Sequence, residues 1–364
     1  MRRKFQKIFL AGTASLCLLS CSSPVNNTAY TDLSEQQSVW QYLNIYSIYQ
    51  ERLPAKCGDM SPYDLFDIIN DSLKGGRFTE YRPDEWFTNL GALDLESQEN
   101  KNNAYPFFSI TNSTAYIRIN EFSYSSYEFF KSSIWRLETY PNIVIDLRGN
   151  GGGFLDICDS IIGEFFPFNT DFIMMRERER VFDSNKYKGI TKEWEAKKTA
   201  TRYPKLRNKK ISVLIDGGSA SASEILASAL KDKANAHLVG KKSYGKGIGQ
   251  AVISRFNRPI LSITSMQIKG LTNRTGDYHG KGIDPDPVPG NFRTAGYETI
   301  RDTSLYFAVK FLEPSANFSQ ILQAIELNCV VLPPSSPSRC VNTSSLAKTR
   351  PIGAYIITEP DPLN

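Results

Sequence analysis

The sequence predicts an α/β fold in which helices cover a mixed or parallel β-sheet. From Ala115 onward, short apolar runs alternate with segments of helical periodicity. Two of the runs, Asn142 to Leu147 and Ile211 to Ile215, are largely apolar, which is typical of buried strands. This alternation of strand and helix is the pattern of a sheet that is covered by helices.

The composition is that of a globular protein. Of 364 residues, 41% are hydrophobic and 12% are aromatic, and we find no repeat period. The net charge is +5, and four of the positive charges lie in the first seven residues. The rest of the chain is therefore close to neutral, which gives little support to nucleic-acid binding. No Cys-x-x-Cys pair or histidine cluster suggests a metal site.

The first residues predict an export signal and a lipid anchor. Met1 to Ser20 is basic and then apolar, but its apolar part is too short to span a membrane. Leu18 to Cys21 resembles a bacterial lipobox, in which the cysteine is lipidated; the alternative is an ordinary signal peptide that is cut nearby. We expect residues 1–20 to be the signal and residues 21–31 a tether. The protein is then held in the cell envelope, on the periplasmic or cell-surface side.

Residues 32–105 predict a helical N-terminal subdomain. A first helix has an apolar face that includes Val39, Leu43 and Tyr46. A second helix begins at Ser61-Pro62 and is expected to turn four apolar side chains inward before ending at Gly75-Gly76. These four are Leu65, Ile68, Ile69 and Leu73. We expect both helices to brace a core.

The catalytic part is expected to span residues 106–312, followed by a C-terminal extension over residues 313–364 in which we recognise no chemistry. Its elements are predicted as strands at 115–120, 142–147, 211–215, 237–240, 251–254 and 260–268, and helices at 124–138, 158–166 and 299–312. Alternating charges over residues 172–209 predict a solvated face, or else a segment that lines the substrate. Cys329 and Cys340 flank a short loop and are candidates for a disulfide.

The stretch from Ile211 to Gln250 contains the strongest candidate for chemistry. A buried strand ends in a glycine turn, and a helix then begins near Ser221. Ser221 and Glu224 have the S-x-x-E spacing of a capping box. The serine hydroxyl therefore lies at a helix N-terminus, where free amides and the helix dipole favour developing negative charge.

Ser221 has two interpretations. Taken alone, it is most simply a helix cap. Its neighbours favour a nucleophile, because Gly217 and Gly218 permit a tight turn, and the small Ala220 and Ala222 leave the hydroxyl uncovered.

A nucleophilic serine needs a base, and the sequence favours lysine. The two histidines, His237 and His279, do not have the setting of a triad member, although sequence order alone does not rule out a triad. A buried lysine can be neutral at working pH. Lys246 lies between two glycines and beside apolar residues, whereas Lys241 and Lys242 are expected to be solvated.

The strings GGSASASEILASAL and YGKGIGQ resemble the active site of the carboxyl-terminal processing, or tail-specific, proteases. The resemblance assigns the nucleophile to Ser221, the general base to Lys246, 25 positions later, and the residue that orients the lysine to Gln250. Family signatures also stand at residues 145–153 and 280–286. The resemblance covers about residues 105–312 and implies a crotonase-like or ClpP-like spiral of β-β-α units.

The glycine run after the second predicted strand is a candidate for the oxyanion hole. Alone it is a flexible turn, or a weak look-alike of a phosphate loop without the lysine. In the context of the resemblance, we assign the amides of Gly152 and Ala222 to the oxyanion hole, and Gly153 is the second choice in place of Gly152. Asp146 and Arg148 are expected to hold the turn by charge-assisted hydrogen bonds.

Members of the resembled family commonly carry a peptide-binding PDZ domain before the catalytic core. Here about 25 residues separate Tyr81 from Phe107, whereas a domain needs at least about 50. We therefore expect no PDZ domain, which puts recognition of substrate C-termini by the usual route in doubt.

The resemblance implies a serine endopeptidase that acts on a protein or peptide substrate and needs no cofactor. The alternative is a catalytically silent, lipid-anchored module that binds peptides or other ligands on the same fold. The complete set of Ser221, Lys246 and Gln250 favours the enzyme. The sequence leaves the natural substrate and the oligomeric state open.

Overall fold

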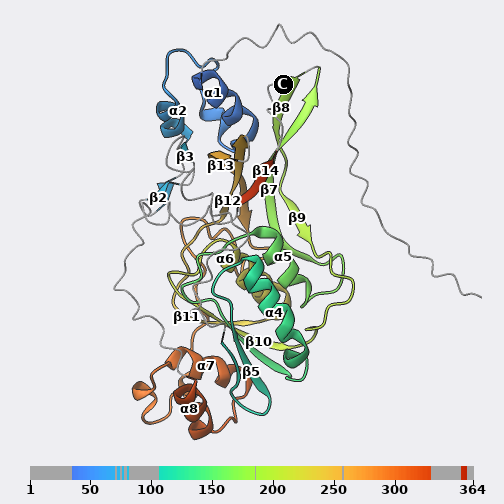
Figure 1. The fold of residues 1–364 in the computed structure, drawn as a ribbon. Helices are drawn as coiled ribbons and strands as arrows, with labels where there is room; N and C mark the ends of the chain where they lie inside the picture. The colour runs from blue at the N-terminus through green and yellow to red at the C-terminus, as the bar shows by residue number, and fades with distance from the viewer. Residues whose placement is uncertain are drawn as a thin grey trace, which may run out of the picture.

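Strand and helix alternate along the chain, as the sequence predicts (Figure 1). The computed structural model describes residues 35–69, 72–73, 76–77, 80–81, 106–184, 186–255, 258–328 and 354–358. Several predictions lie outside these residues: the signal segment, the lipidation of Cys21, the tether, the pairing of Cys329 with Cys340, and the segment that bears on a PDZ domain.

A five-stranded sheet forms the centre of residues 106–312, in the order β11-β10-β6-β5-β4. The four strands from β11 to β5 are parallel, and β4 pairs antiparallel with β5. Their bounds are β4 (Phe107–Ser109), β5 (Thr114–Arg118), β6 (Asn142–Asp146), β10 (Lys210–Ile215) and β11 (His237–Gly240). The predicted α/β class, with a largely parallel sheet, is confirmed.

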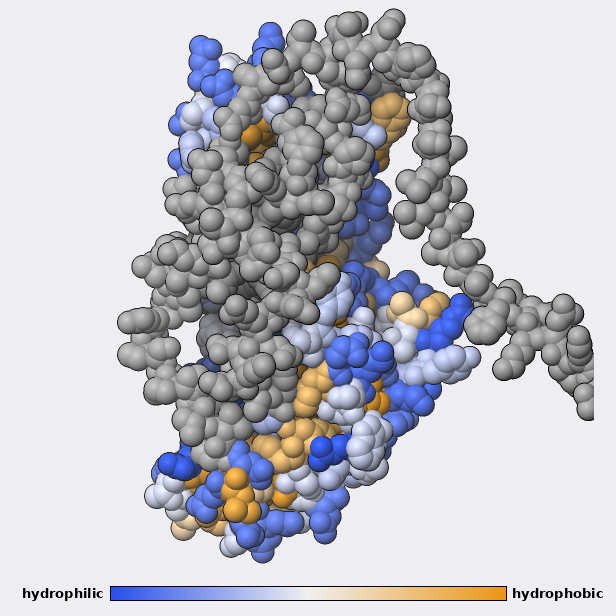
Figure 2. Space-filling model, in the orientation of Figure 1, coloured by the Kyte–Doolittle hydropathy of each residue, from blue (hydrophilic) through white to orange (hydrophobic). Residues whose placement is uncertain are grey.

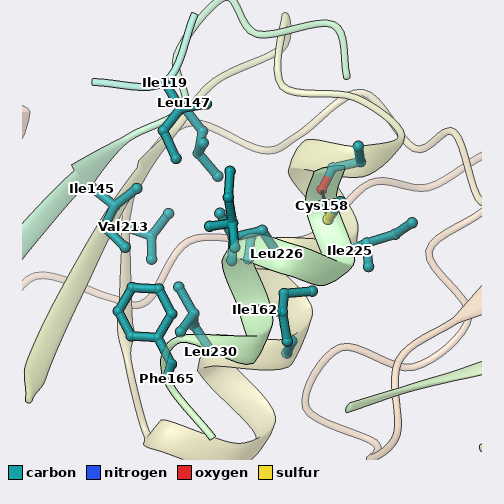
Figure 3. Close-up of a cluster of buried hydrophobic side chains, with 14 of the residues drawn as sticks. Ile119, Ile145, Leu147, Cys158, Ile162, Phe165, Val213, Ile225, Leu226 and Leu230 are labelled. Carbon is teal, nitrogen blue, oxygen red and sulfur yellow. Dashed lines mark hydrogen bonds between the residues drawn. The ribbon is translucent and has the colours of Figure 1, made fainter. Parts of the chain in front are cut away.

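Helices cover one face of this sheet because parallel strands need crossover connections. α4 links β5 to β6, α6 links β10 to β11, and α5 follows β6. These helices are α4 (Tyr124–Leu137), α5 (Leu155–Gly163) and α6 (Ala222–Ala234). Figure 3 shows Ile145 and Val213 of the sheet beside Leu226 and Leu230 of α6, in one buried apolar cluster.

The other face of the sheet is covered by α7 (Thr303–Leu312) and α8 (Phe318–Leu327). Val144 and Leu214 belong to the core on this side, whereas their neighbours Ile145 and Val213 belong to the core under α6. Because successive residues of a strand point to opposite faces, burial of both faces explains why β6 and β10 are largely apolar.

A second sheet has the order β14-β12-β13-β7-β8, and β3 pairs with β13 and β9 with β7. Its pairings are antiparallel except that of β14 with β12. The bounds are β3 (Glu80–Tyr81), β7 (Asp171–Asp183), β8 (Lys186–Thr191), β9 (Glu195–Lys198), β12 (Ile248–Arg255), β13 (Arg258–Lys269) and β14 (Ala354–Thr358). In Figure 1 this sheet extends away from the five-stranded sheet, towards the N-terminal helices.

The N-terminal helices pack on the second sheet, as the predicted bracing role requires. α1 (Glu35–Tyr46) and α2 (Pro62–Ile69) share a buried cluster with β13, and the short helix η1 (Gln50–Arg52) stands between them in the sequence. The second helix is shorter than predicted. Leu73 lies not in this helix but in β1 (Ser72–Leu73), which pairs with β2 (Gly76–Arg77).

The charged segment from residue 172 is only partly a solvated face. Arg178 of β7 is 7% exposed, and its guanidinium donates to the carbonyl oxygens of Asn44 and Ile45 at the end of α1. The carbonyl end of a helix carries partial negative charge, which suits a buried cation. Gly189 of β8 lies so close that a Cβ there would be 2.0 Å from the Ile45 oxygen. Charge pattern alone did not reveal this contact.

Two further elements differ from the prediction. The last predicted helix begins at Thr303, after two short 3-10 helices, η2 (Gly290–Phe292) and η3 (Tyr297–Thr299). The C-terminal extension contributes α8 and β14, which the sequence did not predict. In Figure 2 the visible surface mixes hydrophilic and apolar residues, with apolar ones gathered towards the end of the molecule that carries α7 and α8. None of the helices that the structure describes is long and apolar enough to cross a membrane.

Candidate active site

Ser221 stands at the turn between β10 and α6, as predicted. The turn is tied down by Asp216, whose Oδ1 accepts the backbone N–H groups of Gly149 and Gly218, at 2.9 Å each. Ser219 Oγ donates to the Leu147 carbonyl at 2.8 Å. These bonds connect the turn after β10 to the turn after β6, so the two signature segments lie side by side.

The backbone of Ser221 is strained. Its φ of 57° and ψ of −115° lie in a region of backbone conformation that residues other than glycine rarely adopt. Such strain typically costs about 1–3 kcal/mol and persists where the surrounding structure enforces it, often at functional sites. Ser221 is also 2% exposed. Strain and burial together are more than a helix cap needs.

Glu224 connects the serine turn to the lysine loop. Its side chain is fully buried, and one carboxylate oxygen, Oε2, accepts the backbone N–H of Ser221 at 3.0 Å and that of Lys246 at 2.7 Å. The other oxygen accepts the Gly245 N–H at 2.6 Å and the Ser243 hydroxyl at 2.5 Å. Burial raises the pKa of Glu224, against the lowering effect of these hydrogen bonds.

Sequence reasoning found only half of this role. It recognised Glu224 as the partner of Ser221 in a capping box, and Ser221 N–H does donate to the Glu224 carboxylate. The contacts to residues 243–246 connect positions about twenty apart in the sequence, so local spacing carries no signal for them. The available clue was an acidic residue in an otherwise apolar and small-residue helix start.

Lys246 is buried, with 5% of its surface exposed. Its Nζ donates to Gln250 Oε1 at 3.0 Å, so the structure brings these two predicted site residues together. Burial lowers the pKa of Lys246 to about 7, against the Glu224 carboxylate, which raises it. Lys241 and Lys242 are exposed, as predicted.

The loop that carries Lys246 is braced by the downstream signature. Gly247 N–H donates to Nδ1 of His279 at 3.2 Å, and Ile283 N–H donates to Ser243 Oγ at 2.7 Å. Gly245 has a φ of 95°, and a Cβ there would lie 2.6 Å from the Gly282 nitrogen. The close approach of these two loops therefore depends on glycine.

The prediction for Gly152 disagrees with the structure. Its N–H donates to Asn150 Oδ1 at 2.8 Å, so this amide is already engaged. Gly153, the second choice, lies against Phe122: a Cβ at Gly153 would be 2.2 Å from the Phe122 carbonyl oxygen. Ala222 occupies the first position of α6, where helix N–H groups have no partner within the helix. The oxyanion-hole candidates that remain are the amides of Gly153 and Ala222.

Asp146 and Arg148 hold the turn after β6, as predicted. Arg148 donates to both Asp146 oxygens, with Nη2 at 2.6 Å from Oδ2, and also to both oxygens of Asp302. Tyr116 Oη donates to Asp146 at 2.7 Å. Although burial opposes ionisation of Asp146, the Arg148 guanidinium lowers the pKa of that carboxyl.

The histidines lie in different settings. His237 is on β11, where its ring stacks on Phe311 with centroids 4.2 Å apart. His279 lies on the downstream loop, where its Nδ1 accepts the N–H of Gly247, the residue after Lys246. Within the described ranges, no group of three or more histidine, cysteine or acidic side chains is arranged to hold a metal ion.

The chain is similar to known peptidases. Residues 113–288 match the model of the family described as Peptidase family S41. The carboxy-terminal processing protease CtpB of Bacillus subtilis is 34% identical over 175 residues, which are 48% of this chain and 33% of that protein. The carboxyl-terminal-processing protease of Synechocystis sp. is 33% identical over 178 residues, 48% of this chain and 38% of that protein. The match thus spans about a third of each curated relative.

Two solved structures share the fold over most of the chain. A putative S41 protease from Bacteroides fragilis aligns with a TM-score of 0.51 and 12% identity, covering 79% of this chain and 100% of that chain. A lipoprotein from Streptococcus agalactiae aligns with a TM-score of 0.50 and 13% identity, covering 79% of this chain and 99% of that one. At these identities the likeness concerns the fold alone.

Proposed function

We propose that this chain is a serine endopeptidase in which Ser221 is the nucleophile and Lys246 the general base, since residues 113–288 match the model of Peptidase family S41. The observation that carries this proposal is the state of Lys246. Burial lowers its pKa to about 7, and its amine donates to Gln250. A lysine that is neutral near pH 7 is suited to proton transfer.

The proposed reaction proceeds through an acyl-enzyme. A neutral lysine has two N–H groups and one lone pair. One N–H donates to Gln250 Oε1, and the lone pair is the group that accepts the serine proton. Lys246 takes the proton of the Ser221 hydroxyl as Oγ bonds to the scissile carbonyl carbon. The lysine then gives that proton to the leaving nitrogen as the C–N bond breaks, and an ester remains on Ser221.

Hydrolysis of the ester returns the enzyme to its starting state. Water gives a proton to Lys246 and attacks the ester carbon, the bond to Ser221 Oγ breaks, and the lysine returns the proton to the serine. In both halves of the reaction the carbonyl oxygen carries negative charge. We assign its stabilisation to the amides of Ala222 and Gly153, and one such donor is typically worth about 2.7–4 kcal/mol.

The role of Glu224 in this scheme is positional. Its carboxylate binds the backbone of both Ser221 and Lys246 through a single oxygen. The serine turn and the lysine loop therefore hold a common anchor. We propose that this anchor fixes the approach of the amine to the hydroxyl.

We further propose that the substrate is a protein of the cell envelope. Residues 1–21 support this location, since they have the composition of an export signal followed by a lipidation cysteine at Cys21. The curated relatives are named carboxy-terminal processing proteases, so cleavage near a protein C-terminus is the expected mode. The short interval between Tyr81 and Phe107 supports recognition without a PDZ domain.

Proteolysis by the purified chain tests the proposal. Residues 22–364 are compared with the Ser221→Ala and Lys246→Ala variants on an unfolded protein substrate at pH 6 to 9, and the products are mapped by mass spectrometry. We expect cleavage by the parent chain only, with Lys241→Ala as a matched control that retains activity. If folded parent chain cleaves nothing but binds the substrate, the peptide-binding module is the better account.

A further inference from the structure

The C-terminal segment of the chain adds a strand beside the candidate active site. β14 pairs in parallel with β12, from Gln250 opposite Ala354 to Ser254 opposite Thr358. β14 is the end strand of its sheet, and the other edge of β12 is occupied by β13. Figure 1 shows β14, in dark red, lying along this sheet.

The edge of β12 begins at the site itself. The strand starts at Ile248, two residues after Lys246, and Gln250 is both the first residue paired with β14 and the acceptor for the Lys246 amine. Without β14, residues 250–254 would present an unpaired row of backbone N–H and C=O groups. Such an edge binds extended peptides by strand addition, in which main-chain hydrogen bonds supply the affinity.

We propose that the edge of β12 is the binding site for the segment of substrate that follows the scissile bond, and that residues 354–358 occupy it in place of substrate. This inference rests on the proposed function and extends it to the mode of binding. The ligand is an extended peptide segment. The occupant suggests its chemistry, since Ala354 to Thr358 reads AYIIT, mostly β-branched and aromatic residues that favour strands.

The direction of β14 fixes the direction of the substrate. Because the pairing is parallel, the N-terminal end of β14 lies beside Gln250 and the strand then runs away from the site together with β12. A substrate bound in the same way has its C-terminal residues along β12, while the residues before them reach Ser221 and Lys246. Cleavage would then release a C-terminal piece.

The first test measures binding and does not depend on turnover. Full-length Ser221→Ala chains are prepared with Ile356→Pro, with Ile357→Pro and with neither, and all are checked for folding. Alternate residues of a strand direct their N–H groups to opposite sides, so only one of the two prolines removes an N–H that faces β12. The probe is a fluorescent peptide with the sequence of residues 353–364.

We expect the peptide to bind one proline variant at least about tenfold more tightly than the unsubstituted chain, because a tethered competitor acts at an effective concentration in the millimolar range. Hydrogen exchange at residues 248–255 should be faster in that variant and slow again when peptide is added. Equal binding to all three chains, or exchange at residues 248–255 that does not respond to peptide, would overturn the inference.

The second test uses the active chain. The proline variant that binds peptide should cleave an unfolded substrate faster than the parent, and the free peptide should compete. If peptide binds at β12 and no chain cleaves, the proposed function fails while the binding site stands. If the chains cleave but peptide does not bind β12, this inference fails alone.

Discussion

Burial gives Lys246 its candidate role as a base, and it also makes the charged amine destabilising to the folded state. Its pKa falls to about 7, below the usual lysine value of about 10.4 in an unfolded chain. Between these two values the unfolded chain binds more protons than the folded one, so stability rises with pH. The charged amine therefore destabilises the fold most below pH 7.

Replacing Lys246 with methionine should abolish activity and stabilise the fold. Methionine fills a similar volume without a charge to bury. We expect the melting temperature of Lys246→Met to exceed that of the parent, by more at pH 6 than at pH 9, measured by calorimetry. The exposed Lys241→Met serves as control and should change little. A lower melting temperature for Lys246→Met than for the parent at pH 6 would show that burial of the Lys246 amine does not destabilise the fold.

Glu224→Gln should lower activity and shift its pH dependence. Each oxygen of the Glu224 carboxylate accepts two hydrogen bonds. Glutamine replaces one of these oxygens with an NH₂ group, which cannot accept, so two of the four donors lose their acceptor. Each unsatisfied buried group costs about 1–3 kcal/mol, and we expect kcat to fall about tenfold or more. Since the Glu224 carboxylate raises the pKa of Lys246, its loss should move the acid limb of the pH profile to lower pH.

The pH shift separates positioning from simple damage to the fold. The exposed Glu193→Gln is the matched control and should leave both kcat and the acid limb unchanged. A Glu224→Gln variant with a lower kcat but an unmoved acid limb would contradict an electrostatic contact between Glu224 and Lys246.

At the scale of residues, the sequence predicted Ser221, Lys246 and Gln250 through a resemblance in short strings. It assigned Gly152 to the oxyanion hole and missed the contacts of Glu224 with the lysine loop. The reason is the same in both cases. Whether the Gly152 amide is free depends on where the Asn150 side chain turns, and short-range spacing does not encode that.

At the scale of elements, the turn after β6 is built around Gly153. Its φ of 148° is one that residues other than glycine rarely adopt, and the backbone of Phe122 leaves no room for a Cβ. Gly153→Ala should therefore displace the proposed oxyanion donor and lower kcat by about 100-fold, the usual effect of losing one such donor. Kinetics on a peptide substrate would measure it.

Gly217→Ala provides the matched control for that turn. A Cβ at Gly217 meets nothing within 4 Å, and this glycine lies in the neighbouring turn before Ser221. We expect nearly unchanged kcat. If Gly153→Ala and Gly217→Ala behave alike, the close approach of Gly153 to Phe122 has no catalytic consequence.

Elements with a strong apolar pattern were predicted well, and those fixed by distant contacts were not. β6, β10 and α4 were found within one or two residues because burial sets their periodicity. The buried position of Arg178 depends on where α1 ends, and the pairing of β14 depends on a partner about a hundred residues away. Neither is a local property of the sequence.

At the scale of the whole molecule, Arg148 joins the turn after β6 to the C-terminal helices. It pairs with Asp146 at the end of β6 and with Asp302, whose side chain caps α7 through the Leu305 N–H. Because Asp146 is fully buried, removal of its cation leaves an uncompensated charge.

Arg148→Met should destabilise the fold by about 3–5 kcal/mol at pH 7, the typical cost of breaking a buried ion pair. Urea unfolding measures it. The deficit should narrow as pH falls, since a protonated Asp146 has no charge to compensate. The exposed Arg301→Met is the control and should unfold like the parent. A loss within the error of that control would mean that the pair does not hold α7 to the sheet.

The overall architecture followed from the sequence because both faces of the central sheet are buried, which makes β6 and β10 largely apolar. The second sheet was less predictable, since its strands are joined by pairings between distant segments such as β13 with β7. The nearness of the serine turn and the lysine loop, through Glu224, is likewise a property of the folded chain.

The most direct test of the serine and lysine assignment is the labelling of Ser221 by a fluorophosphonate, followed by mass spectrometry between pH 5 and 9. We predict a single labelled residue, Ser221. Its labelling rate should rise through about pH 7 and fall about tenfold for each unit below the pKa of Lys246, with no labelling in Lys246→Ala. Label on another residue, or equal labelling of Ser221 in folded Lys246→Ala, would contradict the assignment.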